Sequence, residues 1–492
     1  MQFPLPVCLN LVWKRKEVYS MKKHLWIGGQ WLEAREHRPL YAPYSGAHLA
    51  DVAYADAAEV EQALAAAEAA RPLMARMPAH ERAAILERLA ALIRANAERC
   101  AELIALEAAK PITTAKLEVE RTIATYKFAA EEAKRIHGET IPLDAAPGGE
   151  GRIAYTMRQP LGVVAAITPF NFPMNLVAHK VGPAIAAGNT IVLKPAGQTP
   201  LTALLLAELL EQAGLPAGAL NVVTGSGSLI GDLLVTDARV KAVTFTGSPE
   251  VGIAIRSKAG LRRVTLELGS NSALLVDQGV DVDAMIARAV TGAFSFAGQV
   301  CISIQRIYVH EALFDTFVQK FVAQTAKLRL GDPLDPATDV SALISARDAE
   351  RALAWIAEAE QHGAVVAAGN RRDGNVVAPT VLLHAPASTR VACQEAFAPI
   401  VLINRIASIE EGISLVNDSR YGLQAGVYTN DLRTAFAAAE ALEVGGVMIN
   451  DIPTFRVDHM PYGGVKESGT GREGVKYAIE ELTELKLVSI RK

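Results

Sequence analysis

The chain has 492 residues, of which 50% are hydrophobic and 21% are charged, and its formal net charge is −4. This length predicts two or three packed units, and this composition is typical of a globular protein. The small net charge gives no attraction toward nucleic acid or anionic lipid, and no uncharged apolar run is long enough to cross a bilayer. We therefore expect neither a nucleic acid nor a membrane as a partner.

The four cysteines are far apart in the sequence, at Cys8, Cys100, Cys301 and Cys393. No CxxC pair occurs and the ten histidines form no HExxH pattern, so we expect no metal site. Four scattered cysteines do not make a disulfide framework, which favours a reducing, cytoplasmic location.

Residues 1–20 precede a second methionine, Met21, and are predicted to be a disordered N-terminal extension or the result of a misplaced start codon. A signal peptide carries its charges before its apolar stretch, whereas here the apolar residues 7–13 come before the basic residues 14–16. An additional edge strand is the alternative.

The next part of the chain predicts helices and then a hairpin. Residues 79–110 show apolar positions at helical spacing, and Pro111 interrupts the pattern before a second helix at about 114–137. Two short segments, 140–143 and 152–158, flank a Gly-rich turn and read as a β-hairpin.

From residue 161 onward, short apolar strands alternate with amphipathic helices, which predicts an α/β fold with parallel sheets covered on both faces. In the first block we expect strands at 162–168, 190–194, 220–224, 242–246 and 263–268, with helices at about 179–187, 201–213, 227–236 and 249–259. In a second block, about 270–465, we expect strands at 272–276, 305–310, 380–383, 400–406, 425–429 and 446–449. Residues 482–490 predict a last strand.

Two glycine-containing turns could hold a dinucleotide. The run from Gly225 to Gly231 follows a strand and opens a helix, but its spacing is GxGxxxG and no acidic residue ends the following strand. A plain turn explains it equally well. The turn at Gly247 and Ser248 also leads from a strand into a helix, whose first N–H groups could bind a phosphate.

Three polar residues stand where strands or turns end and could carry chemistry. Asn171 could donate to an oxyanion, although an Asn beside Pro is commonly a turn residue. Glu267 could act as a base if its strand end is buried, and otherwise faces water. Cys301 could be a nucleophile or simply a small apolar residue; Cys100 and Cys393 are poorer candidates.

Taken together and in this order, these segments resemble the aldehyde dehydrogenase superfamily. The same resemblance is carried by the runs Lys194-Pro195-Ala196, Phe245-Thr246-Gly247-Ser248, Glu395-Ala396-Phe397-Ala398-Pro399 and Pro461-Tyr462-Gly463-Gly464-Val465-Lys466-Glu467-Ser468-Gly469. It covers the chain from about residue 26 to residue 488. It implies a Rossmann-type cofactor domain, an α/β catalytic domain and a small oligomerisation hairpin.

The resemblance implies an NAD(P)-dependent enzyme that oxidises an aldehyde to a carboxylic acid. Cys301 would attack the aldehyde carbon, and the Asn171 amide and the Cys301 backbone N–H would hold the oxyanion. Hydride transfer to the nicotinamide would leave a thioester on Cys301, and Glu267 would activate the water that hydrolyses it.

The resemblance also assigns cofactor contacts and a substrate pocket. Lys194 would contact the adenosine ribose, Gly247 and Ser248 would approach the pyrophosphate, and Glu395 would bond the nicotinamide ribose. The full set expected at the cofactor is Thr168, Phe170, Lys194, Gly197, Gly227, Phe245, Gly247, Ser248, Leu268, Glu395 and Phe397. Gly197 stands where NAD-specific members often carry Glu, so we expect NADP to be accepted, alongside NAD.

The substrate pocket is expected to contain Arg121, Phe172, Arg456 and His459. Members that oxidise anionic or lactaldehyde-like and glyceraldehyde-like substrates look similar at these positions, which favours a small polar or anionic aldehyde. The alternative is that Arg121 is a surface residue and that Arg456 is a structural ion-pair partner.

The resemblance divides the chain into a dinucleotide-binding domain, 21–138 and 160–268, and a catalytic domain, 269–477. Segments 139–159 and 478–492 would mediate assembly into a homodimer or homotetramer, because an exposed hairpin offers unpaired strand edges. Two alternative functions stay open: an enzyme that passes the acyl group to CoA, and a non-catalytic protein on the same scaffold. The Glu267 carboxylate counts against the first, and the intact catalytic residues count against the second.

Overall fold

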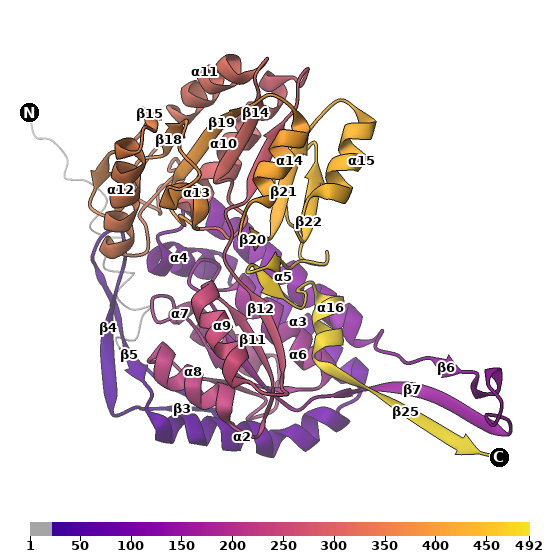
Figure 1. Cartoon of the computed structure of the whole chain (residues 1–492). Helices are drawn as coiled ribbons and strands as arrows, with labels where there is room; N and C mark the ends of the chain where they lie inside the picture. Colours follow the sequence, from indigo (N-terminus) through magenta and orange to yellow (C-terminus); the bar gives the residue numbers. More distant parts are fainter. Residues whose placement is uncertain (1–21) are drawn as a thin grey trace, which may run out of the picture.

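The computed structural model describes residues 22–492, so the expectation for the N-terminal extension lies outside the described residues. Two α/β halves lie one above the other, and a narrow arm of strands projects from the lower half (Figure 1). Both halves are built on mostly parallel sheets, as predicted. Among the described residues, no helix is both long and apolar enough to cross a membrane.

The sheet of the first half has eight strands in the order β24-β12-β11-β8-β9-β10-β2-β3. Its five parallel strands are β8 (Val163–Ile167), β9 (Thr190–Lys194), β10 (Leu220–Val222), β11 (Val240–Thr246) and β12 (Arg263–Glu267). Antiparallel strands complete the edges: β2 (Leu25–Ile27), β3 (Gln30–Leu32) and β24 (Gly469–Thr470). The central strands are buried on both faces, which explains why they read as continuous apolar runs.

Helices cover both faces of this sheet because alternate residues of each strand point to opposite sides. In β8, Val164 and Ala166 pack on one side, against α3 (Ala79–Ala95), α5 (Ile112–Ala133), α6 (Asn175–Ala187) and α7 (Leu201–Gln212). Val163 and Ala165 pack on the other side, against α2 (Ala57–Arg76), α8 (Gly227–Thr236) and α9 (Pro249–Lys258). The last helix, α16 (Val475–Glu481), packs against α5 and α6.

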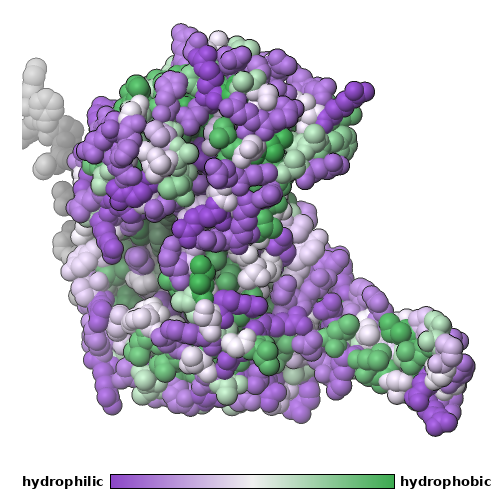
Figure 2. Space-filling view, viewed as in Figure 1, coloured by the Kyte–Doolittle hydropathy of each residue, from purple (hydrophilic) through white to green (hydrophobic). Residues whose placement is uncertain are grey.

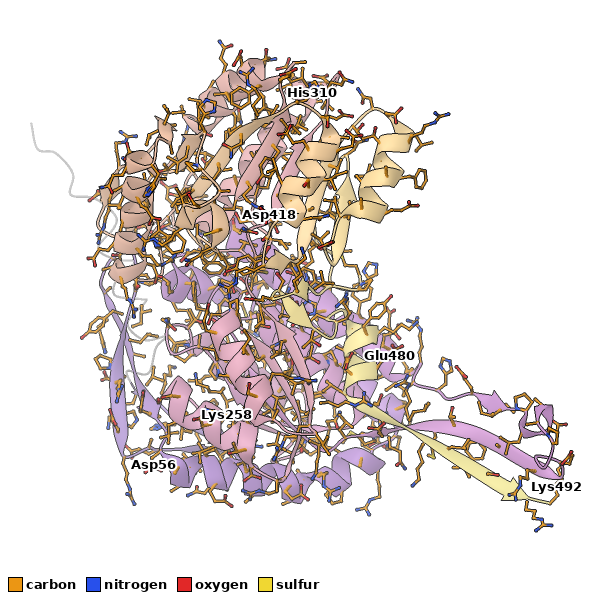
Figure 3. The ribbon with its side chains drawn as sticks, in the orientation of Figure 1. Asp56, Lys258, His310, Asp418, Glu480 and Lys492 are labelled. Atoms are coloured by element: carbon orange, nitrogen blue, oxygen red, sulfur yellow. The ribbon has the colours of Figure 1, made fainter. Side chains whose placement is uncertain are left out.

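Capping residues set where some of these helices begin. Asp56 accepts a hydrogen bond from the Ala58 N–H at 2.7 Å, and the Glu59 carboxylate accepts one from the Asp56 N–H at 2.8 Å, which forms a capping box at the start of α2. Figure 3 labels Asp56 there and Lys258 at the end of α9. The predicted helix 79–110 is in fact two helices, because α3 ends and α4 (Ala97–Ala108) begins at Asn96, whose side chain bonds back to the Leu92 carbonyl.

The sheet of the second half has seven strands in the order β15-β18-β19-β14-β13-β21-β22. Their bounds are β13 (Ala273–Val276), β14 (Arg306–His310), β15 (Val365–Ala368), β18 (Thr380–Leu383), β19 (Ile400–Ile406), β21 (Gln424–Tyr428) and β22 (Gly446–Ile449). One face packs against α10 (Val282–Phe294), α11 (Phe314–Thr325) and α12 (Ala346–Gln361). The other packs against α14 (Ile409–Asn417) and α15 (Leu432–Ala441). The short helix α13 (Arg390–Cys393) follows β18 and precedes β19 in the sequence.

The arm is a three-stranded antiparallel sheet in the order β25-β7-β6. The strands β6 (Thr140–Ile141) and β7 (Arg152–Pro160) form the predicted hairpin, and β25 (Thr483–Arg491) pairs along the whole of β7. Exposed apolar side chains appear as a patch along the arm in Figure 2.

Three smaller sheets complete the description. Near the N-terminus, β5 (His48–Tyr54) pairs with β1 (Lys22–Lys23) and with β4 (Glu36–Tyr41). Two short pairs join β16 (Arg372–Asp373) to β17 (Val376–Val377) and β20 (Tyr421–Gly422) to β23 (Val465–Lys466). The pair β20–β23 and the edge strand β24 bring the C-terminal part of the chain against the end of β12.

Candidate active site

A cavity of about 770 Å³ lies between the two halves, beyond the carboxyl ends of β8, β11 and β12. Ligands bind at this edge of parallel α/β sheets because loops from several strands converge there. Asn171, Glu267 and Cys301 all line this cavity, although they come from segments far apart in the sequence. The structure therefore brings the three predicted catalytic side chains together.

A strained turn presents Cys301 to the cavity. Phe296 and Ala297 have φ values of 49° and 54°, and Gly298 follows with φ 69°. A Cβ on Gly298 would lie 2.2 Å from the Ala398 carbonyl oxygen, so only glycine fits at this position. Backbone strain of this kind is found where a fixed geometry is needed, and here it holds the turn immediately before the cysteine.

Cys301 also lines a second, narrower cavity of about 190 Å³ on the side of α5. Its sulfur lies 2.9 Å from the Tyr462 hydroxyl. Burial raises the pKa of the Cys301 thiol to about 11, while the Tyr462 hydrogen bond and the Arg456 charge act in the opposite direction. The sulfur thus stands where a large and a small cavity meet.

The Asn171 side chain is held in place but keeps donor capacity. Its Nδ2 donates to the Gln299 carbonyl at 2.9 Å, in the turn that leads to Cys301. An amide nitrogen carries two N–H groups, so one stays available for an oxyanion beside the sulfur.

The Glu267 side chain is buried at the end of β12, with 3% of its surface exposed, and neither carboxylate oxygen has a hydrogen-bond partner within residues 22–492. The alternative of a strand-end Glu that faces water is therefore wrong. Burial raises the pKa of Glu267 well above its ordinary value, and repulsion by Glu473 adds to the rise. A buried carboxyl with a raised pKa suits general-base work near neutral pH.

A buried ionic network lies behind Glu267. Two of its members, Lys180 and Glu473, were not predicted from the sequence, whereas the third, Arg456, takes part in an ion pair as the alternative for it expected. Lys180, on α6, binds Glu473 at 3.1 Å, and Glu473 binds Arg456 at 2.9 Å. Lys180 stands in a helix whose every residue is buried, an environment in which a charged side chain needs a partner. That apolar surrounding was the one signal in the sequence that could have pointed to a functional lysine.

Residues 31–488 match the model of the aldehyde dehydrogenase family. The chain belongs to the aldehyde dehydrogenase family. It is 48% identical to a 3-sulfolactaldehyde dehydrogenase of Priestia aryabhattai, over 94% of this chain and 97% of that protein. It is 39% identical to a lactaldehyde dehydrogenase of Methanococcus maripaludis, over 95% of this chain and 99% of that protein.

A solved structure shows the same fold. Glyceraldehyde-3-phosphate dehydrogenase of Methanocaldococcus jannaschii, complexed with NADP, has a TM-score of 0.90 and 40% identity and covers 93% of this chain and 100% of that one. The predicted family and fold class are thereby confirmed, and this aldehyde dehydrogenase is an oxidoreductase that acts on aldehydes.

The larger cavity contains six of the residues expected at the cofactor, namely Phe170, Gly247, Ser248, Leu268, Glu395 and Phe397. The rings of Phe170 and Phe397 meet edge to face with centroids 5.7 Å apart. A Cβ on Gly247 would lie 2.4 Å from Phe245 Cζ, so the Phe245 ring packs directly against this turn. Thr168 also lies behind the lining, where its N–H donates to the Lys194 carbonyl at 3.1 Å.

The other expected cofactor residues lie beside the cavity. Ala196 and Gln198 line the cavity on either side of Gly197, and a Cβ built on Gly197 meets nothing within 4 Å. Lys194 is buried, donates to the Pro195 carbonyl at 2.9 Å, and has its pKa lowered to about 8 by burial. Gly227 is the first residue of α8 and does not line the cavity.

The larger cavity offers groups that suit a dinucleotide. The N-terminus of α9 opens onto it through Ser248 and Pro249, where backbone N–H groups and the helix dipole favour a phosphate. Glu395, which would meet a ribose, accepts the Ser270 N–H at 3.0 Å, and burial raises its pKa to about 7. A ribose hydroxyl would donate a further hydrogen bond to this buried carboxyl and would offset part of the free-energy cost of its burial.

The predicted substrate residues separate into two groups. Arg121, Phe172 and Arg456 line the smaller cavity beside Cys301. His459 does not line it, because it is exposed and packs against the Phe128 ring with centroids 4.8 Å apart. Arg121 is not a free surface cation, since it pairs with the buried Asp458 at 2.7 Å.

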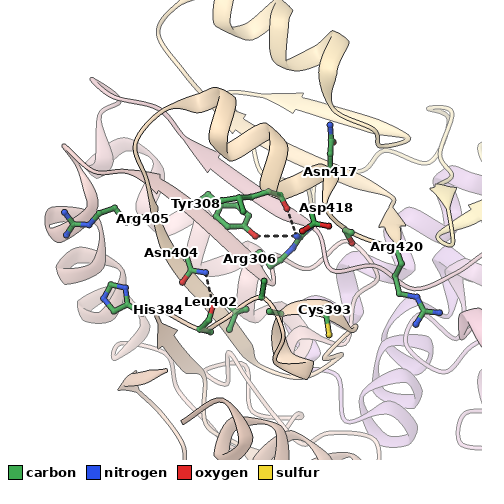
Figure 4. A pocket seen from close by; sticks show the side chains of 15 residues that line it. Arg306, Tyr308, His384, Cys393, Leu402, Asn404, Arg405, Asn417, Asp418 and Arg420 are labelled. Atoms are coloured by element: carbon green, nitrogen blue, oxygen red, sulfur yellow. Dashed lines mark hydrogen bonds between the residues drawn. The ribbon is translucent and has the colours of Figure 1, made fainter. Parts of the chain in front are cut away.

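A further cavity of about 680 Å³ lies in the second half, over β14 and β19 (Figure 4). Its wall includes Cys393 and the buried Arg306, whose Nε donates to the Asn271 carbonyl at 2.9 Å. None of the predicted catalytic residues lines it. Cys393 therefore lines a different cavity from Asn171 and Glu267, which agrees with the expectation that it is a poorer candidate for the nucleophile than Cys301.

Proposed function

We propose that this enzyme oxidises a small anionic aldehyde to the carboxylate through a thioester on Cys301. The observation that carries the proposal is the position of the Cys301 sulfur, where the larger cavity, with Glu267 and Asn171, meets the smaller one, with Arg121 and Arg456. An aldehyde in the smaller cavity and a nicotinamide in the larger one would both reach this atom.

The residues divide the chemistry as follows. The Cys301 thiolate attacks the carbonyl carbon, and the Asn171 amide and the Cys301 N–H stabilise the charge that develops on the oxygen. The nicotinamide, when bound, accepts the hydride of the aldehyde carbon. Glu267 then takes a proton from the water that hydrolyses the thioester.

The cofactor is NAD or NADP, as predicted, since solved relatives hold NADP or NAD+. Glu395, Phe397, Gly247 and Ser248 are the residues that would hold it in the larger cavity. Acceptance of NADP is supported by the open space at Gly197 and by the Lys194 ammonium, whose only hydrogen-bond partner among the described residues is a carbonyl. A 2′-phosphate would offer this buried cation an anionic partner.

The charges behind the smaller cavity favour an anionic substrate. Arg121, Arg456 and Lys180 are cations, whereas Asp458 and Glu473 are the anions with which they pair. These ion-paired side chains number three cations and two anions, which leaves an excess of one positive charge. A substrate with one sulfonate, phosphate or carboxylate group would offset this positive charge. One such molecule is 3-sulfolactaldehyde, the aldehyde in the name of the relative at 48% identity.

The arm supports assembly into a homodimer or homotetramer. Ile153, Tyr155 and Ile490 are about half exposed and share one face of the β7–β25 ribbon. Burial of such a face against a second copy is the ordinary way to stabilise an exposed apolar sheet.

The free thiol required at Cys301 fits a reducing location such as the cytoplasm.

The test is an assay of NAD(P)H formation with 3-sulfolactaldehyde, lactaldehyde, glyceraldehyde 3-phosphate, succinic semialdehyde and benzaldehyde, each with NAD and with NADP. We expect the anionic substrates to give higher kcat/KM than benzaldehyde, and the activity to be lost in Cys301→Ala. Equal values for all aldehydes would contradict the substrate class. An acyl-CoA product when CoA is added would contradict hydrolysis by Glu267 and favour the acylating alternative.

A further inference from the structure

We propose that Tyr462 is a further catalytic residue, whose hydroxyl donates a hydrogen bond to the Cys301 sulfur and stabilises the thiolate, and that Arg456 positions it. The two atoms lie 2.9 Å apart, although 161 residues separate them in the chain. Tyr462 stands in the Pro-Tyr-Gly-Gly segment, and its ring is 2% exposed.

Either atom can donate while the thiol keeps its proton, but once the thiol has ionised only the Tyr462 hydroxyl can be the donor. A thiolate has no hydrogen to give, so the Tyr462 O–H must point at the sulfur in that state. A hydrogen bond to the charged form is stronger than one to the neutral form and therefore favours ionisation. The pKa of Tyr462 is raised well above its ordinary value by burial, so the phenol keeps its proton over the working pH range.

The ring is fixed by contacts that leave the hydroxyl no freedom to move away. The Tyr462 N–H donates to the Glu473 carbonyl at 3.0 Å, and the Glu473 N–H donates back to the Tyr462 carbonyl at 2.6 Å. The Arg456 guanidinium lies 3.7 Å from the centre of the Tyr462 ring, and Glu473 holds that guanidinium at 2.9 Å. A cation on the ring face is attractive and draws electron density from the phenol, which strengthens it as a donor.

The other charged groups around the Cys301 sulfur act on its ionisation in both directions. Arg456 favours the thiolate through its charge, whereas Glu395 and Glu267 disfavour it, and burial opposes it most strongly. In a site that keeps its nucleophile protonated by burial, one fixed donor has a large effect on the thiolate population. The inference rests on the proposed function only in taking Cys301 as the nucleophile.

The experiment measures thiol ionisation without aldehyde or cofactor, so that it does not depend on turnover. Full-length protein is treated with iodoacetamide across a pH series, and alkylation of the peptide that contains Cys301 is followed by mass spectrometry. In Tyr462→Phe the ring and its stacking stay while the hydroxyl is lost. We expect the pKa of Cys301 alkylation to rise by about one unit and alkylation at neutral pH to slow about tenfold.

The matched control is Tyr126→Phe, because Tyr126 on α5 is also fully buried and its hydroxyl has no partner among the described residues. We expect that variant to alkylate as the unmodified protein does. A second variant carries 3-fluorotyrosine at position 462, which is a stronger donor of nearly the same shape. It should move the thiol pKa in the opposite direction from Tyr462→Phe, and it keeps the test sound if the phenylalanine variant folds poorly.

An unchanged or lowered thiol pKa in folded Tyr462→Phe would overturn the inference while leaving Cys301 as the nucleophile. An unchanged or raised thiol pKa in the fluorotyrosine variant would overturn it too. A Cys301 that no alkylating agent modifies at any pH would overturn both the inference and the proposed function.

Discussion

Arg121 and Asp458 form a two-point ion pair, with Arg121 Nη2 at 2.7 Å from Asp458 Oδ1 and Arg121 Nε at 3.2 Å from Oδ2. They lie 337 residues apart in the sequence. Asp458 also accepts hydrogen bonds from Asn175 at 3.0 Å and lies 2.9 Å from His179. The carboxylate thus fixes the Arg121 guanidinium at the wall of the smaller cavity, and the Nη1 of Arg121 stays free of hydrogen bonds to the described residues.

Replacement of Arg121 by Ala is expected to raise KM for anionic aldehydes about tenfold and to leave KM for neutral aldehydes nearly unchanged, because the free N–H groups would bind the anion. Steady-state kinetics with 3-sulfolactaldehyde and benzaldehyde measures both values. Arg94→Ala is the matched control, since Arg94 is an exposed arginine that pairs with Glu120, and neither residue lines the two cavities. An equal loss with both substrates would refute an anion-binding role for Arg121.

The variant Glu267→Gln should accumulate the thioester, because the glutamine amide cannot accept a proton from water. Loss of a general base typically slows a step by about 10²–10⁴-fold. Rapid quenching followed by mass spectrometry of the intact protein detects the acyl group on Cys301. If the acyl-enzyme failed to accumulate while turnover persisted, another group would have to activate the water.

The same carboxyl predicts the pH dependence of thioester hydrolysis. The pKa of Glu267 is raised by burial, so the group is protonated and inactive as a base below that raised pKa. The hydrolysis rate should therefore fall as pH decreases, with an acid limb above the ordinary range for Glu, and this limb should vanish in Glu267→Gln. Single-turnover measurements across pH test the prediction, and an acid limb at the ordinary Glu pKa would contradict it.

The open position at Gly197 predicts control of cofactor preference. A Glu side chain would find open space at this position, and its carboxylate would repel a 2′-phosphate bound there. We expect Gly197→Glu to lower kcat/KM for NADP at least tenfold, about 1.4 kcal/mol, and to leave NAD unchanged or improved. Kinetics with the two cofactors on one enzyme preparation provides the internal control, and a parallel loss with both would count against the role of this position.

The exposed face of the arm predicts an assembly interface. Tyr155→Glu introduces a charge into the apolar face that Tyr155 shares with Ile153 and Ile490, and this should prevent the assembly of subunits that we propose. Ser489→Glu is the control, because Ser489 lies on the opposite face of the same ribbon and is also exposed. Analytical ultracentrifugation measures the subunit number, and an unaltered assembly in Tyr155→Glu would exclude this face from the interface.

The sequence by itself determined the alternation of the central strands and helices of the first half, because apolar periodicity and glycine turns are local properties. It also singled out Cys301, Glu267 and Asn171, since their segments resemble one family in both composition and order. It could not distinguish a buried Glu267 from one that faces water. Burial depends on atoms contributed by distant parts of the chain, and no local pattern contains them.

Only the tertiary structure decided what surrounds the reacting sulfur. The pairing of β24 with β12 places Gly469 opposite Glu267 and carries Tyr462 and Glu473 to the site. The pKa of Glu267 and the geometry at Cys301 are set by these neighbours, because desolvation and charge act through space and not along the sequence.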